Sequence, residues 1–317
     1  MEEFEPQYPA KPELLKRNRE GHISITILSI VVFAITFYFI FSDYFLIALL
    51  LFVLIFHELG HFVFMKLFNY KQLNMLFVPF VGALVSGHKK KYSQIEGGIM
   101  VLAGPLPGIV LGATLILYNW LEPNNLSIQL GTMLIMLNVM NLIPVNPLDG
   151  GKLMQILFFG KFELVQLILT ILISFIVIGV GIYVNSWLVV AFGFIIGFQV
   201  KNQHKLYLIR KELVNEEVQI ESNYDDLTDK TFWQIKNVLM NHTTSLKDLD
   251  DLNDVDNRID QIFAKQVASI LYPPTKKDAS FAFTFFLLTL WLGGILLSIF
   301  AMLSIDLNTV INAFQYR

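Results

Sequence analysis

Residues 57–61, His-Glu-Leu-Gly-His, lie inside a stretch that is hydrophobic enough to cross a lipid bilayer. Outside this pentapeptide, residues 44–68 contain a single charged side chain. Residues four apart share one face of a helix, so His57 and His61 can offer two imidazole nitrogens to one metal ion, with Glu58 beside them. Ionisable side chains are costly to bury in a membrane, so this cluster predicts a functional site.

The composition also indicates a membrane protein. Hydrophobic residues make up 55% of the chain and charged residues 15%, whereas soluble domains carry about 25% charged residues. The charges gather in 201–279, which holds 11 of the 23 basic and 14 of the 26 acidic residues, so we expect that segment to be solvated. A net charge of -3 gives no support for a nucleic-acid partner. Without cysteine, a metal site must use nitrogen and oxygen ligands.

The hydrophobic segments predict an all-α polytopic membrane protein with about six to seven transmembrane helices. The segments are 23–42, 44–68, 97–118, 129–147, 164–184, 187–200 and 281–305. They divide the chain into a cytoplasmic amino-terminal tail (1–22), a transmembrane core (23–200), a cytoplasmic helical segment (201–279) and a last transmembrane helix with its tail (280–317).

Basic residues predict the orientation of these helices. Four Lys or Arg residues in 11–19 precede the first span and three lysines occupy 89–91, whereas the loop 119–128 contains none. We therefore expect a cytoplasmic amino terminus in a prokaryotic cell membrane, with 201–279 on the same side. At 1.5 Å per residue, His57 lies about 20 Å along the second span and roughly 10 Å from the cytoplasmic surface.

A catalytic zinc site with two histidines needs a third protein ligand and keeps its fourth position for water. The other histidines fall in polar flanks or in 201–279, and most acidic residues lie outside the spans, so Asp149 is the best-placed carboxylate. It lies in 141–151, Asn-Leu-Ile-Pro-Val-Asn-Pro-Leu-Asp-Gly-Gly. The two prolines cannot continue a helix and the glycine pair permits a tight reversal, so we expect the fourth span to break here.

The two motifs, in this order on separate membrane helices, resemble those of the site-2 protease family of intramembrane metalloproteases. The resemblance covers about residues 44–155. It includes 103–108, Ala-Gly-Pro-Leu-Pro-Gly, which is similar to a helix of the family that contains Gly-Pro. It also includes 78–82, Val-Pro-Phe-Val-Gly, which is similar to a loop that folds in the family as a membrane-associated β-hairpin.

This resemblance implies roles for five residues of the chain. It implies that His57, His61 and Asp149 bind one Zn²⁺ per chain and that Glu58 is the general base. Asn141, eight residues before Asp149, matches a family asparagine that is thought to hold the substrate carbonyl or stabilise the oxyanion. In this chemistry Glu58 takes a proton from zinc-activated water and returns it to the leaving amine.

The implied activity is hydrolysis of peptide bonds within transmembrane segments of membrane-protein substrates, in regulated intramembrane proteolysis. The partners are then the lipid bilayer and a substrate helix that must unwind locally, with an edge of the hairpin at 77–86 available to pair with it. Two alternatives stay open: a membrane zincin that trims soluble or prenylated peptides, and a non-proteolytic metal-binding scaffold. A peptide-trimming zincin would require a downstream Glu as its third metal ligand. A scaffold that only binds metal would not need Glu58 as a general base.

Two further patterns concern packing and regulation. Many members of the family carry a PDZ domain or a pair of CBS domains, but 119–128 and 201–279 are too short for these. We expect 201–279 to form amphipathic helices that dock on the core or bind a regulatory partner. Gly104, Gly108 and Gly112 form a small-residue stripe that predicts close helix packing on the third span.

Overall fold

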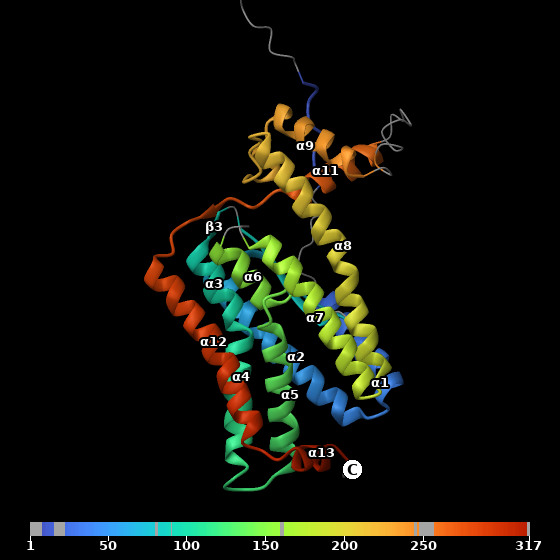
Figure 1. Cartoon of the computed structure of the whole chain (residues 1–317), viewed down its shortest axis with the longest axis vertical. Helices are drawn as coiled ribbons and strands as arrows, with labels where there is room; N and C mark the ends of the chain where they lie inside the picture. The colour runs from blue at the N-terminus through green and yellow to red at the C-terminus, as the bar shows by residue number, and fades with distance from the viewer. Residues whose placement is uncertain are drawn as a thin grey trace, which may run out of the picture. The chain divides into compact units, whose positions relative to one another are not determined.

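The computed structural model describes residues 8–15, 23–79, 82–89, 91–158, 162–243, 246 and 257–315. It confirms the all-α polytopic class predicted from the sequence (Figure 1). Within the described ranges, 5 helical stretches are long and apolar enough to cross a membrane. They are α1 (Ile23–Phe41), α2 (Tyr44–Leu67), α3 (Gln94–Ala103) continued by α4 (Pro105–Tyr118), α7 (Glu163–Tyr183) and α12 (Phe281–Leu303).

The remaining two predicted spans also form helices. One is α5 (Asn125–Asn141), whose 17 residues are slightly fewer than the roughly 20 that cross a bilayer without tilt or local thinning. The other is the apolar first half of α8 (Trp187–Asn215), which runs on for 29 residues into the charged part of the chain. The apolar part of this helix therefore has no loop separating it from the polar part.

The chain divides into two compact units. The core unit comprises 19–162 and 277–317, and the helical unit comprises 1–18 and 163–276. All five residues with roles implied by the sequence lie in the core unit. The four-part domain division predicted from the sequence stays a prediction.

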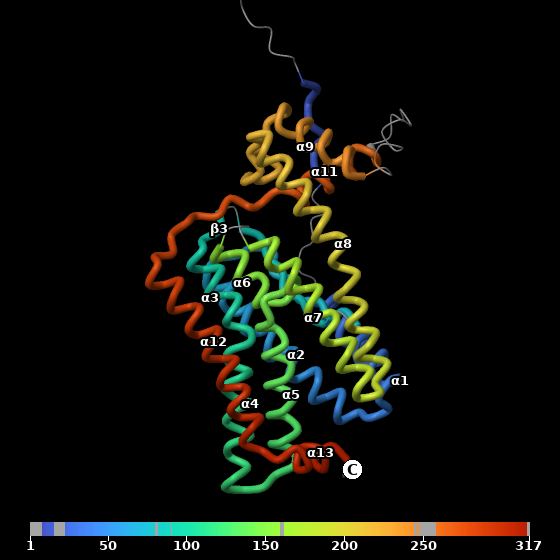
Figure 2. The backbone as a smooth tube through the Cα atoms, viewed as in Figure 1, coloured from blue at the N-terminus to red at the C-terminus, as the bar shows by residue number. Residues whose placement is uncertain are grey.

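Helices in the core unit pack closely because glycines face one another. Helix α4 packs against α5 and α12, and α2 packs against α3 (Figure 2). A Cβ at Gly112 of α4 would lie 2.9 Å from the carbonyl oxygen of Gly131 on α5, and a Cβ at Gly131 would lie 2.9 Å from that of Gly112. A Cβ at Gly60 of α2 would lie 2.0 Å from the carbonyl oxygen of Ala103. The close packing expected from the glycine stripe is confirmed.

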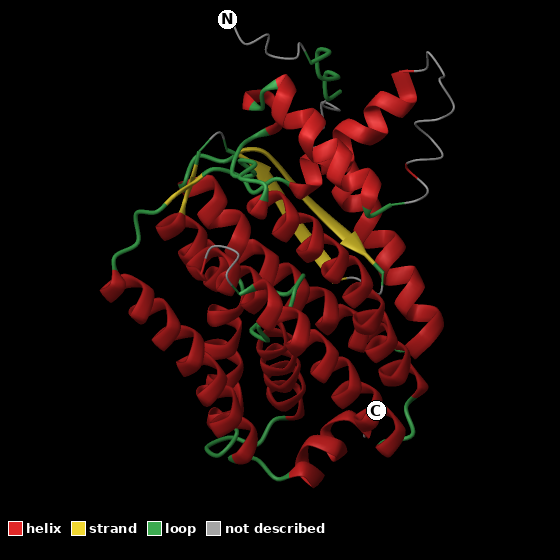
Figure 3. Cartoon of the chain, turned by 45° about the horizontal axis from the view of Figure 1, so that its top comes forward, coloured by secondary structure: helices red, strands yellow, loops and turns green. Residues whose placement is uncertain are grey.

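A β-hairpin follows α2, as the resemblance implied (Figure 3). Strands β1 (Lys71–Val78) and β2 (Gly82–His88) are antiparallel, and residues 80–81 of the predicted loop lie outside the described residues. Two hydroxyls of α1 bond to β1: Thr26 donates to the carbonyl of Met75 at 2.7 Å, and Ser29 accepts from the amide of Phe77 at 3.1 Å. A short strand, β3 (Tyr92–Ser93), then leads into α3.

The predicted break of the fourth span is confirmed, but the glycine pair has another role. Helix α5 ends at Asn141 and α6 (Asp149–Phe158) begins at Asp149. Gly150 and Gly151 lie within the first turn of α6 and do not form a reversal. A Cβ at Gly150 would lie 2.0 Å from the carbonyl oxygen of Leu142. The glycines therefore let the loop after α5 pack against α6.

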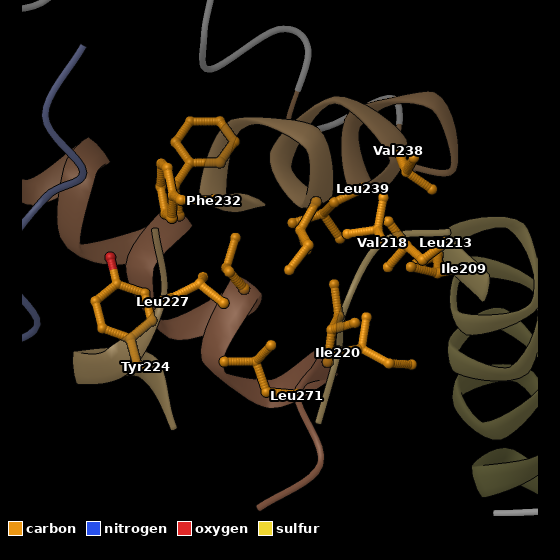
Figure 4. Packing of buried hydrophobic residues seen from close by; sticks show 14 of the residues in the cluster. Ile209, Leu213, Val218, Ile220, Tyr224, Leu227, Phe232, Val238, Leu239 and Leu271 are labelled. Carbon is orange, nitrogen blue, oxygen red and sulfur yellow. The ribbon is translucent and has the colours of Figure 1, made fainter. Parts of the chain in front are cut away.

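The helical unit has a hydrophobic core of its own. Besides α7 and α8 it contains a 3-10 helix, η1 (Tyr224–Asp226), the helices α9 (Asp229–Asn241) and α11 (Asn257–Ile270), and the strand β4 (Thr275–Lys276). Buried side chains of α8, α9 and α11 and of the connecting segments form one cluster, part of which Figure 4 shows. The amphipathic helices expected in 201–279 thus pack on one another. In the core unit, α13 (Leu307–Gln315) ends the described chain.

Candidate metal centre

Two helices bring three ligand atoms to one point. His57 and His61 lie one turn apart on α2, and Asp149 is the first residue of α6. Their exposed fractions are 3%, 8% and 3%. The His57 Nε2 and His61 Nε2 atoms are each 3.1 Å from Asp149 Oδ2, and they are 3.1 Å from each other. The three atoms therefore form a nearly equilateral triangle.

This triangle fits a zinc ion. Tetrahedral zinc with bonds of about 2.0–2.2 Å places its ligand atoms roughly 3.3 Å apart, close to the separations found here. Two imidazole nitrogens and one carboxylate oxygen are also a donor set that zinc accepts in catalytic sites. Among the described residues, His57, His61 and Asp149 are the group of side chains whose ligand atoms lie close enough to hold a metal.

The other ring nitrogens face hydrogen-bond acceptors. His57 Nδ1 lies 2.7 Å from Oδ1 of Asn138, and His61 Nδ1 lies 2.8 Å from the carbonyl oxygen of Met100. A proton on each Nδ1 satisfies these acceptors and leaves each Nε2 lone pair for the metal. Sequence reasoning missed Asn138, although an asparagine inside an apolar helix is a signal that could have found it.

Asp149 presents its two oxygens to different partners. Oδ2 faces the histidines, whereas Oδ1 accepts a hydrogen bond from Lys152 Nζ at 3.0 Å, three residues later on α6. The carboxylate also lies at the amino-terminal end of that helix, where the helix dipole favours negative charge. These contacts orient Asp149 with one oxygen toward the predicted metal position.

The structure places the two predicted catalytic residues differently. Glu58 is buried on α2, with an exposed fraction of 6%, and lies close enough to both histidines and to Asp149 to interact with them electrostatically. Asn141 is half-buried at the end of α5, where its Nδ2 donates to the carbonyl of Leu137 at 3.1 Å. It has no described hydrogen bond to the ligands, so its catalytic role stays a prediction.

Comparisons with known proteins found two similar proteins. The solved structure of the site-2 protease from Methanocaldococcus jannaschii matches 60% of this chain and 93% of that chain, at 22% identity and a TM-score of 0.43. No protein-family model matches. A zinc metalloprotease of the same organism is 30% identical over 120 residues, which are 36% of this chain and 34% of the relative. Over those 120 residues the chain is therefore similar to a zinc metalloprotease.

The similarity to a zinc metalloprotease agrees with the metal-binding motif found in the sequence. The matched region spans about a third of the length of the curated relative. The apolar helices further show that the chain is an integral membrane protein. Three features bear on the function: the ligand triangle, the buried Glu58 and the hairpin.

Proposed function

We propose that this protein is a zinc endopeptidase that hydrolyses peptide bonds within transmembrane segments of other membrane proteins. The observation that carries the proposal is the triangle of His57, His61 and Asp149, buried among apolar helices with the carboxyl group of Glu58 beside it. A buried site that only stored a metal would need the three ligands but not a fourth ionisable group. Regulated intramembrane proteolysis is the proposed role.

Each residue of the site has its own proposed role in hydrolysis. Zinc, when bound, supplies Lewis-acid activation of water and of the scissile carbonyl. Glu58 accepts the proton released from water and returns it to the leaving amine. The amide of Asn141 donates to the oxygen on which negative charge develops. Burial of the site excludes bulk water, which strengthens each of these electrostatic interactions.

The substrate is proposed to bind as an extended segment beside the hairpin. A helical substrate hides its carbonyls in backbone hydrogen bonds, so it must unwind before cleavage. Because Thr26 and Ser29 of α1 already bond to the backbone of β1, we propose that the substrate pairs with β2. Main-chain pairing of this kind would hold the unwound segment without demanding a particular sequence.

The proposed orientation has support from the helical unit. Residues 8–15 bond directly to its polar helices: the amide of Lys11 donates to Asp229 at 2.9 Å, and Lys11 Nζ donates to the carbonyl of Tyr224 at 2.8 Å. These contacts support placing the amino-terminal segment and the polar helices on one side of the membrane. The basic residues near both segments favour the cytoplasm. A regulatory partner would then bind the helical unit from the cytoplasm.

The decisive experiment compares wild type with Glu58→Gln, purified and mixed with a candidate transmembrane substrate in lipid vesicles. We expect Glu58→Gln to keep its zinc and its fold but to lose cleavage, because an amide cannot accept the proton. The loss should reach at least about 10²-fold, since general acid-base catalysis contributes roughly 10²- to 10⁴-fold. Activity above about a hundredth of wild type would contradict the role of Glu58.

Adding soluble and prenylated peptides to this assay separates the two alternative functions. Cleavage of soluble or prenylated peptides, with transmembrane substrates left intact, would favour a membrane zincin that trims peptides. Zinc binding without cleavage of either class would favour a metal-binding scaffold.

A further inference from the structure

Helix α5 carries two asparagines whose surroundings differ. Both donate Nδ2 to the carbonyl four residues earlier: Asn138 to Leu134 at 2.7 Å, and Asn141 to Leu137 at 3.1 Å. Asn138 is fully buried, with an exposed fraction of 0%, whereas Asn141 is half-buried. The Oδ1 atom of Asn138 lies 2.7 Å from His57 Nδ1. No such contact with a histidine is described for Asn141.

These contacts determine which atom of the Asn138 amide faces the histidine. A backbone carbonyl only accepts hydrogen bonds, so the side of the amide toward Leu134 must be the NH₂ group. The oxygen then faces His57, and an oxygen only accepts. His57 Nδ1 must therefore carry the ring proton, and its Nε2 is left with a free lone pair directed at Asp149 Oδ2, 3.1 Å away.

A glycine on the neighbouring helix makes room for this amide. A Cβ at Gly108 of α4 would lie 2.2 Å from Asn138 Nδ2 and 2.7 Å from its Cγ. The amide therefore occupies the space that any larger residue at 108 would fill. Since the carbonyl of Leu134 and the backbone of Gly108 are both parts of rigid helices, the amide has little freedom to rotate.

We propose that Asn138 is a positioning residue that holds His57 in the orientation and tautomer required to bind the metal. The inference rests on the proposed function for the identity of the metal, zinc. Hydrogen-bond partners of metal-bound histidines typically change metal affinity by roughly 10- to 100-fold when removed. The hydrogen-bond acceptor for His61 is a backbone carbonyl, which a substitution does not remove. A substitution at Asn138 therefore removes the acceptor of His57 and leaves that of His61 in place.

The test measures the zinc affinity of full-length variants by competition with a chelator, together with the absorption spectrum of the cobalt-loaded protein. Asn138→Leu keeps a similar volume but removes the acceptor, and we expect its zinc affinity to fall by about 10- to 100-fold. Asn138→Asp keeps an acceptor oxygen facing His57 Nδ1 but loses the donor to the carbonyl of Leu134, and we expect it to recover part of that affinity.

Asn141→Leu is the matched control, because it removes the same kind of bond to the same helix without touching His57. It should leave zinc affinity and the cobalt spectrum unchanged. Equal losses in both leucine variants would mean damage to α5 in general and would overturn the proposal. Wild-type zinc affinity in Asn138→Leu would overturn it as well.

The outcomes for Asn138 and for the proposed function are separable. Zinc binding that depends on Asn138 in a wild type that cleaves no substrate would refute proteolysis and retain the positioning role. If wild type cleaves the substrate but Asn138→Leu binds zinc as tightly as wild type, proteolysis is retained and the positioning role of Asn138 is refuted.

Discussion

At the residue scale, Asp149 contributes the ligand atom that completes the site. Its Oδ2 lies 3.1 Å from both histidine nitrogens, and its Oδ1 is held by Lys152. Without it, the two histidines of α2 would form an incomplete site. The carboxylate comes from a part of the chain 88 residues beyond His61, so the site exists only when the broken segment after α5 packs against α2.

We predict that Asp149→Ala loses zinc together with activity. The loss of affinity should exceed the roughly 10- to 100-fold expected from removing an outer hydrogen bond, because a direct ligand is lost. Metal analysis of the purified variant after dialysis measures it. Asp260→Ala, at an exposed acidic residue of α11 in the helical unit, is the control and should keep its zinc. Full zinc occupancy in Asp149→Ala would place the third ligand elsewhere.

We predict that Asn141→Ala lowers turnover and leaves the zinc in place. Loss of one donor to a developing oxyanion typically costs about 10²- to 10³-fold in rate. Turnover and metal content are measured on the same preparation, with thermal unfolding in detergent as the check on stability. If stability falls as far as activity does, or if zinc is released, the role of Asn141 is instead to hydrogen-bond the backbone at the end of α5.

At the element scale, the contact between α2 and the junction of α3 and α4 depends on the absence of side chains. A Cβ at Gly104 would lie 2.3 Å from His61 Nε2, a ligand atom, and 2.5 Å from His61 Cε1. His61 cannot easily move away, because its Nδ1 is bonded to the carbonyl of Met100. The packing of these helices and the geometry of the ligands are therefore set by the same contact.

We predict that Gly104→Ala displaces His61, weakens zinc binding and costs about 1–3 kcal/mol of stability from overpacking. Chelator competition and thermal unfolding measure the two effects. Gly293→Ala on α12 is the control, because a Cβ there has no heavy atom within 4 Å. It should be neutral or stabilising by up to about 1 kcal/mol, since alanine favours helix over glycine. Equal effects of the two substitutions would contradict the proposed role of the close contact.

At the scale of the whole molecule, the amino-terminal segment is part of the helical unit. The carbonyl of Pro9 accepts from Trp233 Nε1 at 2.7 Å, and that of Pro12 accepts from the Tyr224 hydroxyl at 2.7 Å. Burial raises the pKa of Tyr224 to about 12, so the hydroxyl stays protonated and continues to donate well above neutral pH. Segments more than two hundred residues apart in the chain are thus held together in one unit.

We predict that both segments lie in the cytoplasm. The natural chain has no cysteine, so single cysteines can be labelled without background. With a membrane-impermeant maleimide on intact cells, Asn125→Cys at the start of α5 should react, and Lys230→Cys on α9 should react only after permeabilisation. Both positions are exposed in the structure. The reverse pattern would contradict the proposed topology.

The sequence by itself determined the local features: the apolar helices, the two histidines on one face of α2, the break after Asn141, and the hairpin by resemblance. Each depends on spacing within a short stretch, such as the four-residue repeat of a helix or a proline that lacks its amide hydrogen. Asp149 could also be predicted, since few other carboxylates lie within an apolar segment.

Only the tertiary structure decided which groups orient those ligands. The acceptor for His57 comes from α5 and the acceptor for His61 is a backbone carbonyl of α3, and no spacing along the chain relates either one to α2. The true role of Gly150 and Gly151, packing and not reversal, likewise appears only when the neighbouring carbonyls are in place. These contacts join segments distant in sequence, so they are set by how helices pack and not by any local pattern.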